Sequence, residues 1–136
     1  MITAVDTSVL LDVFGADAKF LDRSKNALRS AMRVGGLLAC EVVWAEVGAF
    51  FGSPDAAAGA MDRIGIVYDP LSREAALTAS VAWRRYRRRG GIRTRVIADF
   101  LIGAHAAERA DRLLTRDRGF YRSYFKGLKI ADPSRQ

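Results

Sequence analysis

The first fourteen residues, MITAVDTSVLLDVF (1–14), contain two apolar runs separated by a carboxylate. Residues 2–5 have the length and composition of a short buried strand, and a second apolar run begins at Val9. Asp6 lies between them and precedes two hydroxyl residues. Two explanations are open for this acid. It caps the helix that follows, or it is the first ligand of a site at the end of the strand.

The rest of the chain continues this alternation of strand and helix. We expect strands at 2–5, 37–40, 66–68, 112–115 and 128–131. We expect helices at 8–14, 19–34, 42–51, 55–63, 72–89, 96–110 and 118–125. Such alternation is typical of a parallel sheet covered on both faces. The sequence therefore predicts an α/β fold, with one domain spanning 1–136.

The composition is that of a globular protein, since half of the 136 residues are apolar. No apolar run approaches the roughly 18 residues that span a membrane, and no charged segment followed by a long apolar stretch suggests a signal peptide. Cys40 is the only cysteine, which excludes an internal disulfide and suits a reducing compartment. One cysteine and one histidine, His105, also exclude a thiolate or imidazole zinc site. We expect a cytoplasmic protein without a membrane partner.

The excess positive charge lies in one segment. Lysine and arginine number 22 against 15 acids, and RRYRRRGGIRTR (84–95) contains seven arginines. Without these seven, basic and acidic residues are equal in number, at 15 each. A local basic patch predicts an anionic partner, nucleic acid first, although a solvated helix end would have the same composition. The predicted RNA-binding residues are Arg84, Arg85, Arg87, Arg88, Arg89, Arg93 and Arg95.

Four acids lie where acids are unexpected. Asp6 and Asp117 follow the first and fourth predicted strands, at the edge where open parallel sheets bind ligands. Glu46 and Asp99 are each the only charge in an apolar helical stretch, VVWAEVGAFF and VIADFLIGAHA. Each acid has a structural explanation of its own. Asp6, Asp117 and Asp99 suit helix caps, and Glu46 suits an ion pair or an exposed helix face.

A shared site explains all four acids together. Four carboxylates in one pocket repel one another unless a cation neutralises them. Hard oxygen ligands without histidine or cysteine favour Mg²⁺ or Mn²⁺ over zinc. The other acids, among them Asp12, suit solvated helix or turn positions, and His105 is expected to be packed rather than to act as a general base. We therefore predict that Asp6, Glu46, Asp99 and Asp117 are both the metal ligands and the catalytic residues.

Four pieces of the chain, in this order, resemble a known family: VDTSVLLD (5–12), VVWAEV (42–47), ADFLIGAHA (98–106) and LLTRDRGFYRSYF (113–125). They are similar to the PIN-domain nucleases and, within them, to VapC-type toxins of bacterial type II toxin–antitoxin pairs. The resemblance implies a three-layer α/β/α domain with a parallel five-stranded sheet. It also implies an endoribonuclease that uses Mg²⁺ or Mn²⁺.

The family's four acids match Asp6, Glu46, Asp99 and Asp117, and polar positions that line such sites match Thr7, Ser8 and Thr115. Many relatives carry a further acid two positions after the fourth, where this chain has Gly119, so a second metal does not follow from the resemblance. The implied reaction is metal-assisted attack of water on an RNA phosphodiester. Its products would carry a 5′-phosphate and a 3′-hydroxyl.

The resemblance also implies two protein partners, a cognate antitoxin and a second copy of the chain. The helix at 42–51 is apolar on nearly every side, and some of its surface, with Trp44, Phe50 and Phe51 as main contributors, is expected to be exposed as an interaction patch. An antitoxin arginine that reached the acids would inhibit by replacing the charge of the metal.

Two other functions are weighed against this one. An aspartyl phosphatase or phosphotransferase commonly needs a second aspartate two residues after the nucleophile, where this chain has Ser8. A non-catalytic RNA-binding domain of the same fold has no need for four acids. We therefore favour the metal-dependent ribonuclease.

Overall fold

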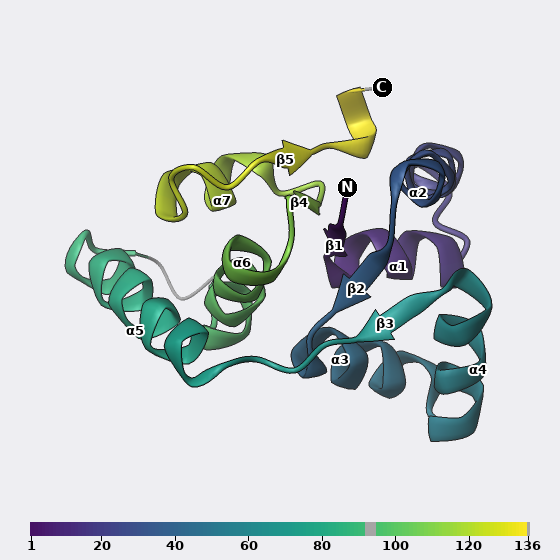
Figure 1. The fold of residues 1–136 in the computed structure, drawn as a ribbon, viewed down its shortest axis with the longest axis horizontal. Helices are drawn as coiled ribbons and strands as arrows, with labels where there is room; N and C mark the ends of the chain where they lie inside the picture. The colour runs from purple at the N-terminus through teal and green to yellow at the C-terminus, as the bar shows by residue number, and fades with distance from the viewer. Residues whose placement is uncertain (92–94, 136) are drawn as a thin grey trace.

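The computed structural model describes residues 1–91 and 95–135. Its centre is a parallel sheet in the order β3-β2-β1-β4-β5 (Figure 1). The strands are β1 (Thr3–Val5), β2 (Leu37–Ala39), β3 (Ile66–Tyr68), β4 (Arg112–Leu114) and β5 (Ile130–Ala131). The predicted α/β fold with a parallel five-stranded sheet is confirmed.

The helices follow the predicted order, with bounds that move by one or two residues. They are α1 (Thr7–Phe14), α2 (Leu21–Val34), α3 (Glu41–Phe51), α4 (Pro54–Ile64), α5 (Arg73–Arg88), α6 (Ile97–Arg109) and α7 (Arg118–Tyr124), with a final 3₁₀ turn η1 (Pro133–Arg135). In Figure 1, α5, α6 and α7 lie to the left of β1, and α1, α2 and α4 lie to its right. The sheet therefore forms the middle layer.

Two predicted elements begin later than expected, for local reasons. The second helix was expected from residue 19 but begins at Leu21, because Oδ1 of Asp17 accepts the N–H groups of Lys19 and Phe20, at 2.8 Å each, in a turn. The last strand was expected from residue 128. There the N–H of Leu128 donates to the carbonyl of Phe125 instead, across a turn at Gly127 with φ of 89°.

The register of the sheet fixes the position of the strand ends. Val5 on β1 pairs with Leu114 on β4, and the N–H of Asp6 donates to the carbonyl of Leu114 at 3.0 Å. The residues that follow these two strands, Asp6 and Thr115, are therefore neighbours at the same edge. They are 109 positions apart in the chain.

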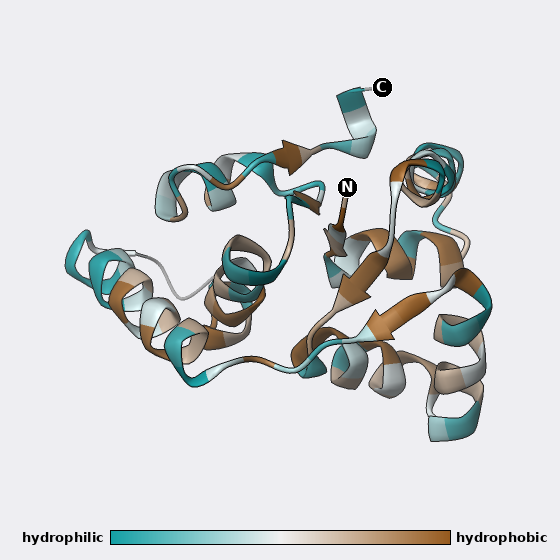
Figure 2. Cartoon of the chain, viewed as in Figure 1, coloured by the Kyte–Doolittle hydropathy of each residue, from teal (hydrophilic) through white to brown (hydrophobic). Residues whose placement is uncertain are grey.

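The central strands of the sheet belong to the core. Strands β1 and β2 are buried at every position, as expected for a sheet covered on both faces. Figure 2 shows that β2 and β3 are hydrophobic. Helix α5 packs along α6 (Figure 1). Near their ends, the ring of Phe100 contacts the rings of Tyr86, Phe120 and Tyr124, with centroids 5.2–5.8 Å apart. No helix within 1–91 or 95–135 is both long and apolar enough to cross a membrane.

Asp12 was expected to be solvated, and that expectation is wrong. The residue is 3% exposed on α1. Its carboxylate accepts two hydrogen bonds from Arg116, at 2.8 and 3.0 Å, and one from Ser24 at 2.7 Å. The guanidinium of Arg116 also lies 4.0 Å from the centre of the Phe20 ring. Because Arg116 follows β4, this network ties α1 and α2 to the loop that carries Thr115 and Asp117.

His105 is packed, as expected. It is 1% exposed on α6, and its Nε2 lies 2.8 Å from Oδ2 of Asp69. The same carboxylate accepts two hydrogen bonds from Arg109, at 3.0 and 3.1 Å. These bonds, first from Arg109 and then from His105, outweigh burial and hold the pKa of Asp69 below its ordinary value. His105 therefore attaches α6 to the segment after β3.

Candidate active site

Asp6 is the most buried of the four predicted acids, at 7% exposed. It follows β1 and precedes α1 in an extended conformation, and its side chain makes no capping hydrogen bond to that helix. Instead, Oδ2 of Asp6 accepts a hydrogen bond from the Thr115 hydroxyl at 2.7 Å and a longer one from the Ser8 hydroxyl at 3.4 Å. The helix-cap explanation therefore fails for Asp6, and its carboxylate is held by side chains at the sheet edge.

Glu46 reaches the same region from α3. Its Oε1 accepts a hydrogen bond from the Thr7 hydroxyl at 2.7 Å. The apolar surroundings in the sequence suggested burial, but Glu46 is exposed. Helical periodicity accounts for the difference, since Val43 and Val47 face the core and Glu46 lies outside that buried face.

Asp99 combines two of the explanations offered for it. It lies in the first turn of α6, where its Oδ2 accepts a hydrogen bond from the N–H of Val96 at 3.3 Å, so it does cap the start of the helix. Its charge nevertheless contributes, after burial, to raising the pKa of Asp6, which places it within electrostatic reach of that carboxylate. Asp99 is half-buried.

Asp117 is engaged by an arginine. It precedes α7 and makes no side-chain cap there, so the cap explanation fails for this residue also. Its Oδ2 forms an ion pair with Nη1 of Arg95, whose guanidinium lies 4.3 Å from the centre of the Phe120 ring. Burial alone would lower the pKa of Arg95, but Asp117 and then Asp99 raise it. The N–H of Asp117 donates to the Thr115 hydroxyl at 3.0 Å, which links Asp117 through Thr115 to Asp6.

Three of the acids interact electrostatically. The pKa of Asp6 is raised to about 6, mainly by burial; the hydrogen bond from Thr115 opposes the rise, and the charges of Asp99 and Glu46 contribute to it. A site with uncompensated negative charge and only oxygen donors suits a hard divalent cation. Within the described residues, no three Asp, Glu, His or Cys side chains are already grouped closely enough to hold a metal. The metal site thus stays a prediction, supported by its donor chemistry.

Tyr121 is a residue that the sequence analysis missed. It lies on α7, four positions after Asp117, and is 1% exposed. Burial, followed by the charges of Asp6, Asp99 and Asp117, raises the pKa of its phenol well above the ordinary value. Its spacing from Asp117 places both on one helical face, but an aromatic residue in an amphipathic helix is normally assigned to the core.

The predicted RNA-binding arginines divide into groups. Arg84, Arg87 and Arg88 line an open hollow of about 350 Å³. The guanidiniums of Arg85 and Arg89 lie 5.5 and 5.8 Å from the Tyr124 ring, and Arg85 also donates to the carbonyl of Ser123 at 3.3 Å. Arg95 pairs with Asp117, and Arg93 lies outside the described residues.

Comparison with known structures agrees with the fold described above. The fold resembles VapBC2 from Rickettsia felis bound to a DNA fragment from its promoter, with 18% identity, a TM-score of 0.75 and coverage of 97% of this chain and 98% of that one. It resembles a toxin–antitoxin complex from Klebsiella pneumoniae, with 19% identity, a TM-score of 0.67 and coverage of 96% and 97%. It also resembles VapC20, a sarcin-ricin loop cleaving toxin of Mycobacterium tuberculosis, with 17% identity, a TM-score of 0.55 and coverage of 82% and 86%.

At these identities the solved structures show a common fold. No curated protein matches the chain in sequence. The model of the PIN domain family matches residues 3–126, a span that contains all four acids and the hydroxyls bonded to them. The chain therefore belongs to the PIN domain family.

Proposed function

We propose that this chain is a single-domain, metal-dependent endoribonuclease that acts in the cytoplasm as the toxin of a toxin–antitoxin pair. The observation that carries the proposal is the buried Asp6 carboxylate at the edge of the sheet, on which the charges of Asp99 and Glu46 act. Membership of the PIN domain family supports a nuclease. The similarity to VapC20, a toxin that cleaves the sarcin-ricin loop, supports RNA as the substrate class.

Within this proposal, Asp6 and Asp99 hold Mg²⁺ or Mn²⁺, with Glu46 and Asp117 beside them. The bound ion would supply an activated water and offset charge on the scissile phosphate. Thr115 orients Asp6 through a 2.7 Å hydrogen bond, and Thr7 orients Glu46 through another of the same length. Arg95 brings a positive charge to the acids, at a place suited to an RNA phosphate.

Cleavage should depend on a divalent ion. We expect the purified protein to cut structured RNA in the presence of Mg²⁺ or Mn²⁺, and to lose this activity in excess EDTA, because carboxylates alone do not activate water strongly. Gel analysis of a labelled RNA before and after EDTA, with metal added back as the control, measures the dependence. Undiminished cleavage in EDTA contradicts the proposal. Metal-independent binding without any cleavage favours the RNA-binding alternative.

The hollow lined by Arg84, Arg87 and Arg88 should contribute to RNA affinity by neutralising phosphates. Replacing Arg84 and Arg88 with glutamine should flatten the dependence of log affinity on log salt by roughly 0.7 for each single-strand phosphate that the variant no longer neutralises. Arg29, which is exposed on α2, provides the control substitution. Fluorescence anisotropy at several salt concentrations measures the slope. An unchanged slope in the double variant would mean that these arginines are only a solvated helix surface.

We also propose an antitoxin and a second copy of the chain as partners. The Klebsiella pneumoniae structure, a toxin–antitoxin complex, supports the first. Arg95, which neutralises Asp117 within the chain, illustrates how an antitoxin arginine would neutralise Asp6 or Asp99.

The apolar surface on α3 that suggested self-association is smaller than expected. Phe50 is 49% exposed, but Phe51 packs on Phe14 with ring centroids 5.2 Å apart, and Trp44 packs on Tyr68 at 5.6 Å. We expect a dimer by light scattering that Phe50→Ser weakens by removing exposed apolar area. A wild-type monomer at high concentration contradicts this expectation.

A further inference from the structure

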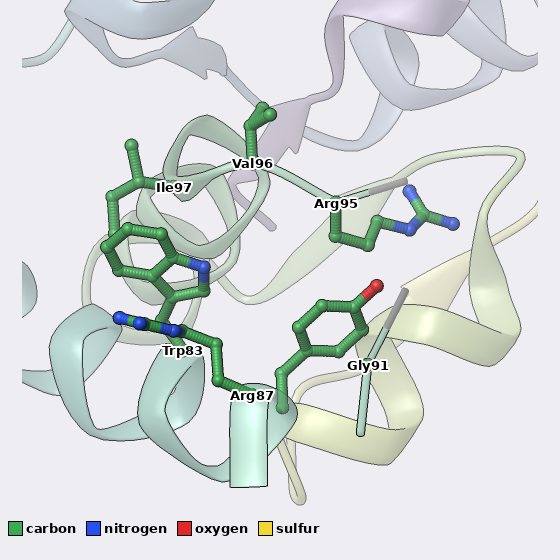
Figure 3. Close-up of a pocket in the computed structure, with 7 residues that line it drawn as sticks. Trp83, Arg87, Gly91, Arg95, Val96 and Ile97 are labelled. Carbon is green, nitrogen blue, oxygen red and sulfur yellow. The ribbon is translucent and has the colours of Figure 1, made fainter. Parts of the chain in front are cut away.

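A second hollow, of about 590 Å³, lies between the carboxyl-terminal half of α5 and the start of α6 (Figure 3). Its lining mixes three kinds of side chain, which are aromatic, aliphatic and cationic. They include Trp83, Tyr86, Arg87, Arg95, Val96 and Ile97. Val96 and Ile97 are 56% and 37% exposed, so the hollow presents apolar walls to solvent. The apolar walls suit a flat, partly apolar group, and the arginines at the edge suit negative charges next to that group.

This hollow adjoins the four acids. Arg95 lines it and also pairs with Asp117. Val96 lines it and donates its N–H to Asp99 at 3.3 Å. In Figure 3, Trp83, Arg87 and Ile97 gather at one side, and Arg95 points away toward the other. A molecule in this hollow therefore lies beside the candidate active site, with Arg95 between the two.

The charge around the hollow favours a nucleic acid over an apolar protein segment. Arg87 lines this hollow and also the one formed with Arg84 and Arg88, so the two share a basic wall. The Arg87 guanidinium lies 5.4 Å from the centre of the Trp83 ring, which makes a flat surface of the kind on which bases stack. The Tyr86 ring packs against the rings of Phe100 and Tyr124, whose centroids lie 5.5 and 5.7 Å from its own.

We propose that this hollow binds one unpaired base of the RNA, stacked on Trp83, with its flanking phosphates on Arg87 and Arg95. The inference rests on the proposed ribonuclease function and adds a preference for unpaired RNA. Bases within an A-form helix are stacked and paired, and its deep, narrow groove keeps side chains out, whereas bases in loops and single strands are free to stack on aromatic residues. The hollow thus selects loops and single strands as substrates.

The test measures binding without cleavage. A fluorescent twelve-nucleotide single strand, and the same sequence as a blunt duplex, are titrated with the protein in EDTA and followed by anisotropy. We expect Trp83→Ala to weaken single-strand binding by about tenfold or more, the loss of one base–aromatic stack, and to change duplex binding by less than about twofold. Trp83→Phe should retain most of the affinity. Trp44→Phe, on α3 away from this hollow, is the matched control.

A second measurement reports on the stack directly. In the Trp44→Phe variant, Trp83 is the remaining tryptophan, and its fluorescence should be quenched by the single strand and unaffected by the duplex. Unchanged single-strand affinity in Trp83→Ala overturns the inference, as does an equal loss of affinity for both RNAs. Because this binding is measured in EDTA, a failure to cleave RNA in the presence of Mg²⁺ or Mn²⁺ would contradict the proposed function and leave the binding result standing.

Discussion

Replacing Asp6 with asparagine should abolish RNA cleavage and stabilise the metal-free protein at the same time. Asparagine keeps the shape of the side chain and can still accept the Thr115 hydrogen bond, but it removes one charge from the proposed metal site. Losing several kcal/mol of metal-assisted stabilisation lowers the cleavage rate by on the order of 100-fold or more. The folded state, by contrast, becomes more stable, because the substitution removes a buried carboxylate that is repelled by the charges of Asp99 and Glu46.

The gain in stability should depend on pH. Since the folded pKa of Asp6 is about 6 against an ordinary 3.8, ionised Asp6 disfavours the folded state fully above pH 6, and this penalty disappears below about pH 4. We expect Asp6→Asn to raise the free energy of unfolding by about 1–3 kcal/mol at pH 7 in EDTA. The gain should shrink toward zero as the pH falls through this window.

Chemical denaturation at pH 7 and pH 4, together with the RNA cleavage assay, checks both parts of this prediction. Asp62→Asn, at an exposed acid on α4, is the control and should change neither stability nor cleavage appreciably. Asp99→Asn should lose cleavage in the same way, with a smaller gain in stability, because Asp99 is only half-buried and also caps α6. A folded Asp6→Asn variant with full activity would show that Asp6 is not a ligand.

Replacing Arg116 with alanine should destabilise the protein by about 3–5 kcal/mol, because it leaves the buried Asp12 carboxylate without its charged partner. Asp12 is 3% exposed and accepts both of its charged hydrogen bonds from Arg116. The Ser24 hydroxyl remains, but one neutral donor does not offset a buried charge. The substitution also removes the guanidinium that lies over Phe20.

A double-mutant cycle separates these effects. We expect Asp12→Ala combined with Arg116→Ala to be less destabilised than the sum of the single variants, since the double variant buries no unpaired charge. Urea denaturation of the four proteins gives the coupling energy, and Arg29→Ala serves as an exposed control. Strict additivity, or a loss below about 1 kcal/mol for Arg116→Ala, would mean that water takes over the role of the arginine.

The fold could be predicted from short apolar runs because the central strands β1 and β2 are buried at every position and so carry their signal locally. The position of Asp6 relative to Thr115 also follows from the sequence, since parallel strands end at a common edge. The burial of Asp12 could not be predicted, because its partner Arg116 lies 104 residues away and nothing near Asp12 indicates the pairing.

The sequence indicated which acids to compare, but it did not indicate the surroundings of each one. Glu46 was predicted as a site residue because it is the only charge in an apolar stretch, yet it is exposed. Apolar neighbours along a helix do not determine which face a given position occupies. The pairing of Arg95 with Asp117 could not be foreseen either, because the arginine was counted with a cluster expected to face RNA. Tyr121 was missed because its inward position depends on where α7 packs.

The order of the strands determines when the candidate site can form during synthesis of the chain. The sheet places β1 between β2 and β4, and Asp6 is completed by Thr115 from beyond β4. In the nascent chain, Asp6 is made 109 positions before Thr115, so its carboxylate lacks the hydroxyl that holds it until β4 and the residue after it have been synthesised. The non-local pairing of β1 with β4 therefore delays completion of the candidate site until this part of the chain has left the ribosome. An enzyme of the proposed kind would thus gain its site only after most of the domain has been made.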